Sequence, residues 1–247
     1  MPPTVTQIAA ALADETDADR YWREGDPVGV WLGSPRPVRR LGLRLEAGRA
    51  PYAWADGLDA VLLHRPFGLW PARLPDGLGV LAYHRALDER FAVGHNPALA
   101  RDLGLEPEGE PLRRGGQIVG LVGALPAPLA AADVLGRVAD VLGGVEETAG
   151  AEAAALSGAA DVSRVALVGA MTEALVAEAA ERGVGVYVTG QVRRPGVAPA
   201  ETAGVLVAAV GQERAERWGL RHLGRLVAAR WPDVEVVDAD EGGADRG

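Results

Sequence analysis

The sequence predicts an α/β protein built from two related lobes. Short apolar runs bounded by glycine or aspartate alternate with segments of helical periodicity, as expected where helices cover a mostly parallel sheet. The order strand–helix–strand occurs in both halves, and parts of the two halves resemble each other. With 247 residues, 48% of them hydrophobic, the chain is long enough to bury a large core.

The first half carries one predicted helix and four predicted strands. Residues 4–12 have the apolar spacing of a short helix, and residues 38–45 alternate loosely, as a strand does. The apolar runs 60–63, 80–83 and 118–122 have the length of strands that are buried on both faces of a sheet.

The second half shows a clearer alternation of elements. Apolar residues at helical spacing within 129–142 predict a helix that Gly143 ends. Residues 148–160, rich in alanine and glycine, fit either a loop or a frayed helix. The acidic residues 238–247 are expected to be disordered. The other predicted elements are strands 165–168, 186–189, 205–210 and 234–237, and helices 172–181 and 213–230.

Three pairs of segments indicate an internal duplication. The pairs are 38–43 with 162–167, 57–64 with 183–190, and 79–84 with 204–210. Their common order predicts parallel strands with helices on the faces of each sheet. We therefore expect a first lobe of residues 1–118 and a second lobe of residues 119–247, joined near 112–124.

Composition argues against several classes of function. The chain has no cysteine, which excludes thiolate metal sites, and all 25 of its basic residues are arginine, which excludes lysine-based catalysis and a P-loop. A net charge of −9 without a basic stripe argues against a nucleic-acid partner. Apolar runs fall short of the roughly 18 residues of a membrane helix, and the N-terminus lacks signal-peptide features, so we expect a cytoplasmic protein with no membrane partner.

Two histidines in the first half follow strands of the buried type. They are His64 and His84, and Asp88 comes four residues after the second. Because ligands collect at the carboxyl ends of parallel strands, the two imidazoles should lie side by side. Two imidazoles and a carboxylate suit a divalent metal ion. A pair of hydrogen-bonded histidines at strand ends is the alternative, and the pattern leaves both open.

A second candidate position lies at the start of the last helix. Gln212 and Glu216 are four residues apart and therefore share one face of that helix. Glu216 also falls on the apolar stripe, where a carboxylate is costly unless it is paired or bound to a metal. An ion pair with Arg65 or another arginine is the alternative to a metal.

These motifs, in this order, resemble those of the Nif-three-like family of dinuclear-metal-centre proteins, also called GTP cyclohydrolase I type 2 homologues. The family's Asp-Asn-Val-Gly-Leu is Asp-Pro-Val-Gly-Val here (26–30), its Ser-His-His-Pro is Leu-His-Arg-Pro (63–66), and its His-x-x-x-Asp is kept (84–88). Its Thr-Gly-Asp/Glu is Thr-Gly-Gln (189–191), and its Gly-His-x-x-x-Glu is Gly-Gln-Glu-Arg-Ala-Glu (211–216). The resemblance covers nearly the whole chain.

The resemblance implies two metal ions held by a histidine pair, an aspartate, a C-terminal histidine and a bridging glutamate. His64, Asp88 and Glu216 match ligands of the family, whereas Arg65 replaces the second histidine of the pair and Gln212 replaces the C-terminal histidine. The chain is therefore expected to be a degenerate member that binds one divalent metal ion (Zn, Mn or Fe) or none. Arg65 is expected to supply a substitute positive charge to Glu216 or Asp88.

The resemblance also implies a toroidal hexamer and two possible functions. The first is metal-assisted hydrolysis of a nucleotide-like small molecule, with His84 as a proton shuttle or an additional ligand. The second, favoured by the two replaced ligands, is a non-catalytic binding or scaffold hexamer with a reduced or absent metal site.

Overall fold

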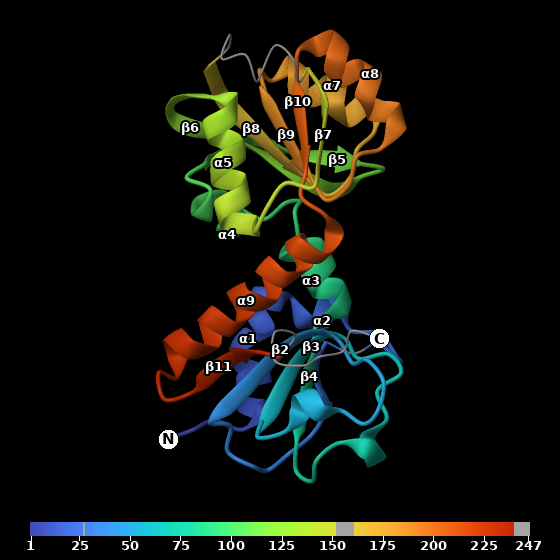
Figure 1. Ribbon diagram of the computed structural model, residues 1–247, viewed down its shortest axis with the longest axis vertical. Coiled ribbons are helices and arrows are strands. Elements are labelled where there is room, and N and C mark those ends of the chain that lie inside the picture. Colours follow the sequence, from blue (N-terminus) through green and yellow to red (C-terminus); the bar gives the residue numbers. More distant parts are fainter. Residues whose placement is uncertain (27, 152–160, 240–247) are drawn as a thin grey trace. The chain divides into compact units, whose positions relative to one another are not determined.

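The computed structural model describes residues 1–26, 28–151 and 161–239 and divides the chain into two compact units (Figure 1). The first unit comprises Met1–Asp88 and the chain from Gly219 onward, and the second comprises Glu89–Trp218. This division differs from the expected boundary near residue 118. The physical reason is that the chain returns to the first unit, where β11 (Glu235–Asp238) pairs with β2 (Arg40–Glu46).

The first unit is built on a five-stranded sheet in the order β1-β4-β3-β2-β11. Strands β2, β3 (Ala60–Arg65), β4 (Gly79–Ala82) and β11 run parallel, and β1 (Gly29–Leu32) pairs antiparallel with β4 at one edge. The central strand β3 is buried from Ala60 through His64, as predicted for a strand covered on both faces.

Helices and short turns complete the first unit. α1 (Val5–Thr16) begins with a capping box, in which Thr4 and Gln7 each accept a hydrogen bond from the other's backbone N–H. Its buried side chains include Val5, Ile8 and Leu12. The remaining elements are α2 (Ala18–Tyr21), the 3-10 turns η1 (Ala53–Ala55) and η2 (Pro71–Arg73), and α3 (His84–Arg90), which begins two residues after β4 ends.

The last helix, α9 (Gln212–Arg230), belongs to both units, since the division falls within it. In the first unit its residues Leu220, Leu223 and Val227 are buried, on the stripe that the sequence predicts. Gly224 lets this part of the helix approach the sheet closely, because a Cβ there would lie 2.9 Å from Leu43 Cδ1.

The second unit is built on a six-stranded sheet in the order β5-β6-β8-β9-β10-β7. Strands β8 (Asp161–Val168), β9 (Val186–Thr189) and β10 (Leu206–Ala209) run parallel. The other three pair antiparallel: β5 (Glu106–Arg114), β6 (Gln117–Ala130) and β7 (Glu147–Gly150).

Helices cover both faces of this second sheet (Figure 1). Alternate residues of β9 enter different cores: Val186 and Val188 pack with α4 (Pro97–Asp102) and α5 (Ala131–Leu142), whereas Tyr187 packs with α7 (Glu173–Glu181) and α8 (Arg194–Ala203). A strand buried on both faces therefore reads as a continuous apolar run, which is the pattern that predicted it.

The two sheets repeat one arrangement. In the first unit β2, β3 and β4 are parallel neighbours, and antiparallel β1 lies beyond β4; in the second, β8, β9 and β10 are parallel neighbours, and antiparallel β7 lies beyond β10. These are the strands that the sequence paired as an internal repeat. The chain therefore has two related α/β lobes.

Some elements differ from the sequence-based expectation. The helix expected within 129–142 begins only at Ala131, because β6 continues through Ala130. Strands β1, β5 and β7 were not predicted. Of the ambiguous stretch 148–160, the first residues belong to β7, whereas residues 152–160 and most of the acidic tail, 240–247, lie outside the described residues.

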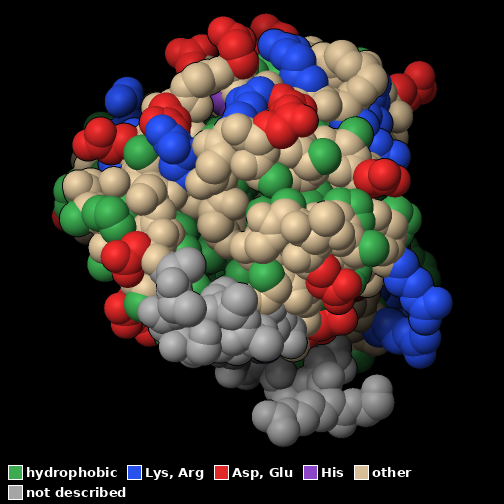
Figure 2. Space-filling view, turned by 90° about the horizontal axis from the view of Figure 1, so that it is seen from above, with side chains coloured by type: hydrophobic (Ala, Val, Ile, Leu, Met, Phe, Trp, Pro, Cys, Tyr) green, Lys and Arg blue, Asp and Glu red, His purple; other side chains and the backbone are tan. Residues whose placement is uncertain are grey.

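Two further observations concern the helices and one face of the surface. Within the described ranges, every helix is too short or too polar to cross a lipid bilayer. Acidic and basic side chains are interspersed over the face of the molecule shown in Figure 2, where no broad patch of a single sign is visible.

The contact between α1 and the start of β4 gives a stability prediction. A Cβ on Gly79 would lie 2.3 Å from Val5 Cγ1 and 3.3 Å from Ser34 Cβ, and Val5 is fully buried with a branched, stiff side chain. We expect Gly79→Ala to lower the free energy of unfolding by about 1–3 kcal/mol through overpacking. Gly33→Ala, with no atom within 4 Å of its Cβ, is the matched control. Thermal denaturation measures both, and equal melting temperatures would contradict the packing described.

Candidate metal centre

Three potential metal ligands converge at the carboxyl end of the first sheet. His64 is the penultimate residue of the central strand β3, and His84 opens α3 just beyond the neighbouring strand β4. Because Leu63 pairs with Ala82 in the parallel register, the residues that follow each strand are carried to the same edge. Asp88 lies one turn further along α3, so its side chain and that of His84 share a helix face.

The geometry of these residues is compact. The rings of His64 and His84 are 5.3 Å apart, which confirms that the two imidazoles lie side by side. Asp88 approaches both, with Oδ1 3.0 Å from His64 Nε2 and Oδ2 3.5 Å from His84 Nε2. One potential ligand atom from each residue lies within 4.8 Å of the other two, and among the described residues this is the one such group.

The potential ligand atoms at this site suit a metal ion. Asp88 Oδ1 is buried and accepts no hydrogen bond from the described residues, so its 3.0 Å separation from His64 Nε2 is a close approach of two potential ligand atoms without donor–acceptor alignment. Two imidazole nitrogens and one carboxylate oxygen form a ligand set that suits Zn, Mn or Fe. These three residues can therefore hold a metal ion.

Burial differs across the three residues. The side chain of His64 is fully buried, whereas those of His84 and Asp88 are 25% and 35% exposed. Tyr83, which precedes His84, is also fully buried, and this burial raises the pKa of its phenol, so the ring stays neutral beside the site. The group thus has a closed side at His64 and a side that solvent reaches at Asp88.

Two neighbours of His84 were missed as site residues by the sequence analysis. Asp26 Oδ2 lies 2.9 Å from His84 Nδ1, and Phe67 packs edge-on to the His84 ring with centroids 5.0 Å apart. Asp26 opens the first motif of the family resemblance, which was the only signal for it. Phe67 follows β3 closely in sequence, but nothing in its pattern indicates a contact with a residue 17 positions later.

The other predicted site residues have defined local contacts. Arg65 Nη1 lies 3.1 Å from Glu46 Oε1 on the adjacent strand β2. In the second unit, Gln212 Nε2 donates a hydrogen bond of 3.0 Å to Glu216 Oε1, which confirms that the two side chains share a helix face. Glu216 is 1% exposed. Its role as a ligand with His64 and Asp88, and the role of Arg65 as a substitute cation, stay predictions.

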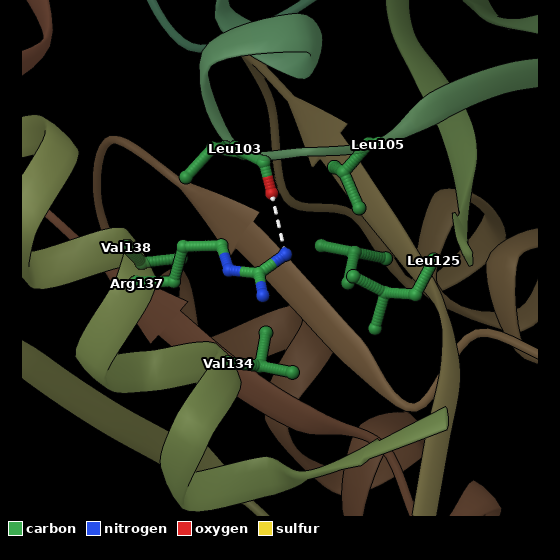
Figure 3. Close-up of a pocket in the computed structure, with 7 residues that line it drawn as sticks. Leu103, Leu105, Leu125, Val134, Arg137 and Val138 are labelled. Carbon is green, nitrogen blue, oxygen red and sulfur yellow. Dashed lines mark hydrogen bonds between the residues drawn. The ribbon is translucent and has the colours of Figure 1, made fainter. Parts of the chain in front are cut away.

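The cavity in Figure 3 is a packing defect of the second unit and no candidate site. It holds about 10 Å³, room for one water at most, and is lined by Leu103, Leu105, Leu125, Val134, Arg137, Val138 and Val165. Arg137 Nη1 donates to the Leu103 carbonyl oxygen at 3.2 Å, so its charged end is hydrogen-bonded there.

His95, in a loop of the same unit, has its pKa lowered by burial and by the charges of Arg90 and Arg113.

The comparisons with known proteins agree with the arrangement of these motifs. The family model of Duf34/NIF3 (NGG1p interacting factor 3) matches residues 3–241. The chain belongs to the Duf34/NIF3 family. It is 29% identical over 238 residues to the GTP cyclohydrolase 1 type 2 homolog of Pseudomonas aeruginosa, a match that covers 87% of this chain and 91% of the relative.

Solved structures share the Duf34/NIF3 fold of this chain. The structure of protein ybgI, of unknown function, has a TM-score of 0.68 and 22% identity, covering 95% of this chain and 96% of that one. A Bacillus cereus protein related to NIF3 has a TM-score of 0.61 and 15% identity, covering 96% and 97%. At these identities the structural likeness establishes the fold of this Duf34/NIF3 protein, and its site must be argued from its own residues.

The three candidate ligands give a direct prediction for this Duf34/NIF3 protein. We expect each of three variants, His64→Ala, His84→Ala and Asp88→Ala, to weaken Zn²⁺ or Mn²⁺ binding by at least roughly 10–100-fold. Loss of an outer-shell partner of a metal ligand has an effect of that size, and these variants remove the candidate ligand atom itself. His222→Ala, a histidine on α9 that contacts Arg225, is the matched control. Competition with a chromophoric chelator on untagged protein measures the affinities. Equal losses in the control and the ligand variants would contradict the assignment.

Proposed function

We propose that this Duf34/NIF3 protein binds one divalent metal ion at His64, His84 and Asp88 and acts as a metal-dependent hydrolase of a nucleotide-like small molecule. The observation that carries the proposal is the convergence of two imidazoles and a carboxylate at a strand end that solvent reaches. The names of the relatives, GTP cyclohydrolase 1 type 2 homologs, agree with a nucleotide as substrate.

The residues of the site have different proposed roles, which follow from their burial and position. His64 is fixed within the central strand and fully buried, so it provides a rigid ligand. Asp88 presents one oxygen to each imidazole, so ligand atoms of all three residues face one point. With a single carboxylate among the three candidate ligands, a divalent cation held there would keep a net positive charge and would supply Lewis-acid activation of water. The exposed sides of His84 and Asp88 leave room for water and substrate.

Phe67 supports the choice of a substrate with an aromatic ring. Its side chain is 50% exposed although it contacts the ring of His84, so an uncovered apolar surface lies directly beside the candidate ligands. Stacking of a nucleobase on an aromatic side chain contributes about 1–3 kcal/mol and tolerates different bases. A base on Phe67 would hold the rest of a nucleotide near His84 and Asp88.

Gln212 and Arg65 favour a second candidate function, a non-catalytic binding or scaffold protein with a reduced metal site. The amide of Gln212 is hydrogen-bonded to the buried carboxylate of Glu216, and the guanidinium of Arg65 is paired with Glu46. Each replaces an imidazole that the family uses as a ligand, so the second metal ion loses two of its ligands. We extend the proposal to a homohexamer, which rests on the family resemblance alone.

Hydrolysis should depend on both the metal ligands and Phe67. Protein loaded with Mn²⁺ or Zn²⁺ is expected to release phosphate or pyrophosphate from a nucleoside triphosphate, and Asp88→Asn is expected to abolish the release. Phe67→Ala should raise KM by about 5–100-fold through loss of stacking, with kcat little changed. Trp70→Ala is the control, since Trp70 is also exposed and its ring contacts Arg73, at 5.2 Å, instead of a candidate ligand.

A steady-state assay of released phosphate distinguishes the two functions. If the wild-type protein releases no more phosphate than Asp88→Asn, the hydrolase function is contradicted and the binding function is the one that stands. An unchanged KM in Phe67→Ala, with hydrolysis intact, would remove only the stacking role.

The replaced ligands give a prediction about stoichiometry. Wild-type protein should hold at most one metal ion per chain, and the double variant Arg65→His with Gln212→His should hold more, because two imidazoles return to the positions where the family has them. Elemental analysis after dialysis against Zn²⁺ measures the ratio, with Arg65→Ala and Gln212→Ala as the matched control. Two equivalents in the wild-type protein, or no gain in the double variant, would contradict the loss of one metal position.

A further inference from the structure

We propose that Asp26 is the positioning residue that orients His84 for metal binding. In this role, Asp26 Oδ2 accepts a hydrogen bond from His84 Nδ1–H, and the Nε2 lone pair is left facing Asp88 and the metal position. The inference rests on the metal site proposed above and assigns a further residue to it.

The distances place His84 between two carboxylates. Its Nδ1 lies 2.9 Å from Asp26 Oδ2, and its Nε2 lies 3.5 Å from Asp88 Oδ2. A neutral imidazole carries one N–H and one lone pair, while an ionised carboxylate only accepts. In the neutral ring, the shorter contact places the proton on Nδ1, and the lone pair on Nε2 then faces the carboxylate of Asp88. A cation between Nε2 and Asp88 resolves that opposition of lone pairs.

Asp26 is held in place independently of His84. It closes a tight turn in which Asp26 N–H donates to the Arg23 carbonyl at 3.1 Å and Arg23 N–H donates to the Asp26 carbonyl at 3.3 Å. Gly25 adopts φ +79° within this turn, a conformation that favours glycine. The guanidinium of Arg23 also donates to the carbonyls of Arg20 and Trp22. A carboxylate on a turn built by backbone contacts can act as a fixed reference for the ring.

The burial of Asp26 points to a role beyond a surface ion pair. Its side chain is 19% exposed, and its second oxygen, Oδ1, is buried with no hydrogen bond from the described residues. The other oxygen, Oδ2, is the one that faces His84 Nδ1. A carboxylate in that position fixes the ring of a metal-binding histidine and raises the basicity of its ligating nitrogen.

The test combines metal affinity with the tautomer of His84. Asp26→Ala should weaken Zn²⁺ binding by about 10–100-fold, measured by competition with a chromophoric chelator. Asp19→Ala removes the same charge from an exposed position of α2 and should leave the affinity unchanged. In ¹⁵N spectra of the metal-free protein, His84 should carry its proton on Nδ1 in the wild type and lose that preference in Asp26→Ala.

The outcomes separate this inference from the proposed function. Wild-type affinity and tautomer in Asp26→Ala would overturn the positioning role while leaving the metal site standing. If the wild-type protein binds no Zn²⁺, the metal site is overturned. If Asp26→Ala nevertheless loses the Nδ1–H tautomer of His84, the positioning of the ring by Asp26 is retained. Should Asp26→Ala fail to fold, the isosteric Asp26→Asn carries the same test with an expected loss of about tenfold, and unchanged affinity there overturns the inference.

Discussion

The parallel pairing of β3 with β4 is the constraint on which the candidate metal centre depends. Leu63 faces Ala82 in that register, so His64 at the end of β3 and His84 just beyond β4 lie at one edge of the sheet. A shift of one residue would direct His64 to the opposite face, because side chains alternate along a strand. The helix that begins at His84 then brings Asp88 back to the two imidazoles within one turn. Register, strand order and helix spacing together produce the cluster.

The charges around the cluster favour a cation there. Asp26 and Asp88 lie on either side of His84, and both present oxygens that are buried without a hydrogen bond among the described residues. Two carboxylates around one imidazole in a partly dry site concentrate negative charge there. A divalent ion at the three candidate ligands would offset that charge. The half-exposed ring of Phe67 offers a surface for a substrate beside the same position.

Much of the fold and part of the site could be predicted from the sequence. Strands β3, β4, β9 and β10 are short apolar runs between glycines and aspartates, and burial on both faces makes such runs recognisable. By contrast, β5 (Glu-Pro-Glu-Gly-Glu-Pro-Leu-Arg-Arg) lies at an edge and is mostly exposed, so its composition resembles a loop. The boundary between the units could not be predicted, because the pairing of β11 with β2 joins residues about 195 positions apart.

The site shows the same division between local and distant information. His64, His84 and Asp88 were predictable because each is placed by its own strand end or helix turn. The contact of Asp26 with His84 joins a turn to a helix 58 residues later, and no periodicity encodes such a contact. Arg65 illustrates the limit of reasoning from substitution: its type indicated a cation near the acids of the site, and the structure also gives it Glu46 on the neighbouring strand.

Anomalous diffraction from crystals of the full chain soaked in Mn²⁺ or Zn²⁺ tests the central claim most directly. We expect one strong anomalous peak about 2.0–2.2 Å from a nitrogen of His64, a nitrogen of His84 and an oxygen of Asp88. An empty map at these three residues, with the metal located elsewhere on the chain, would contradict it.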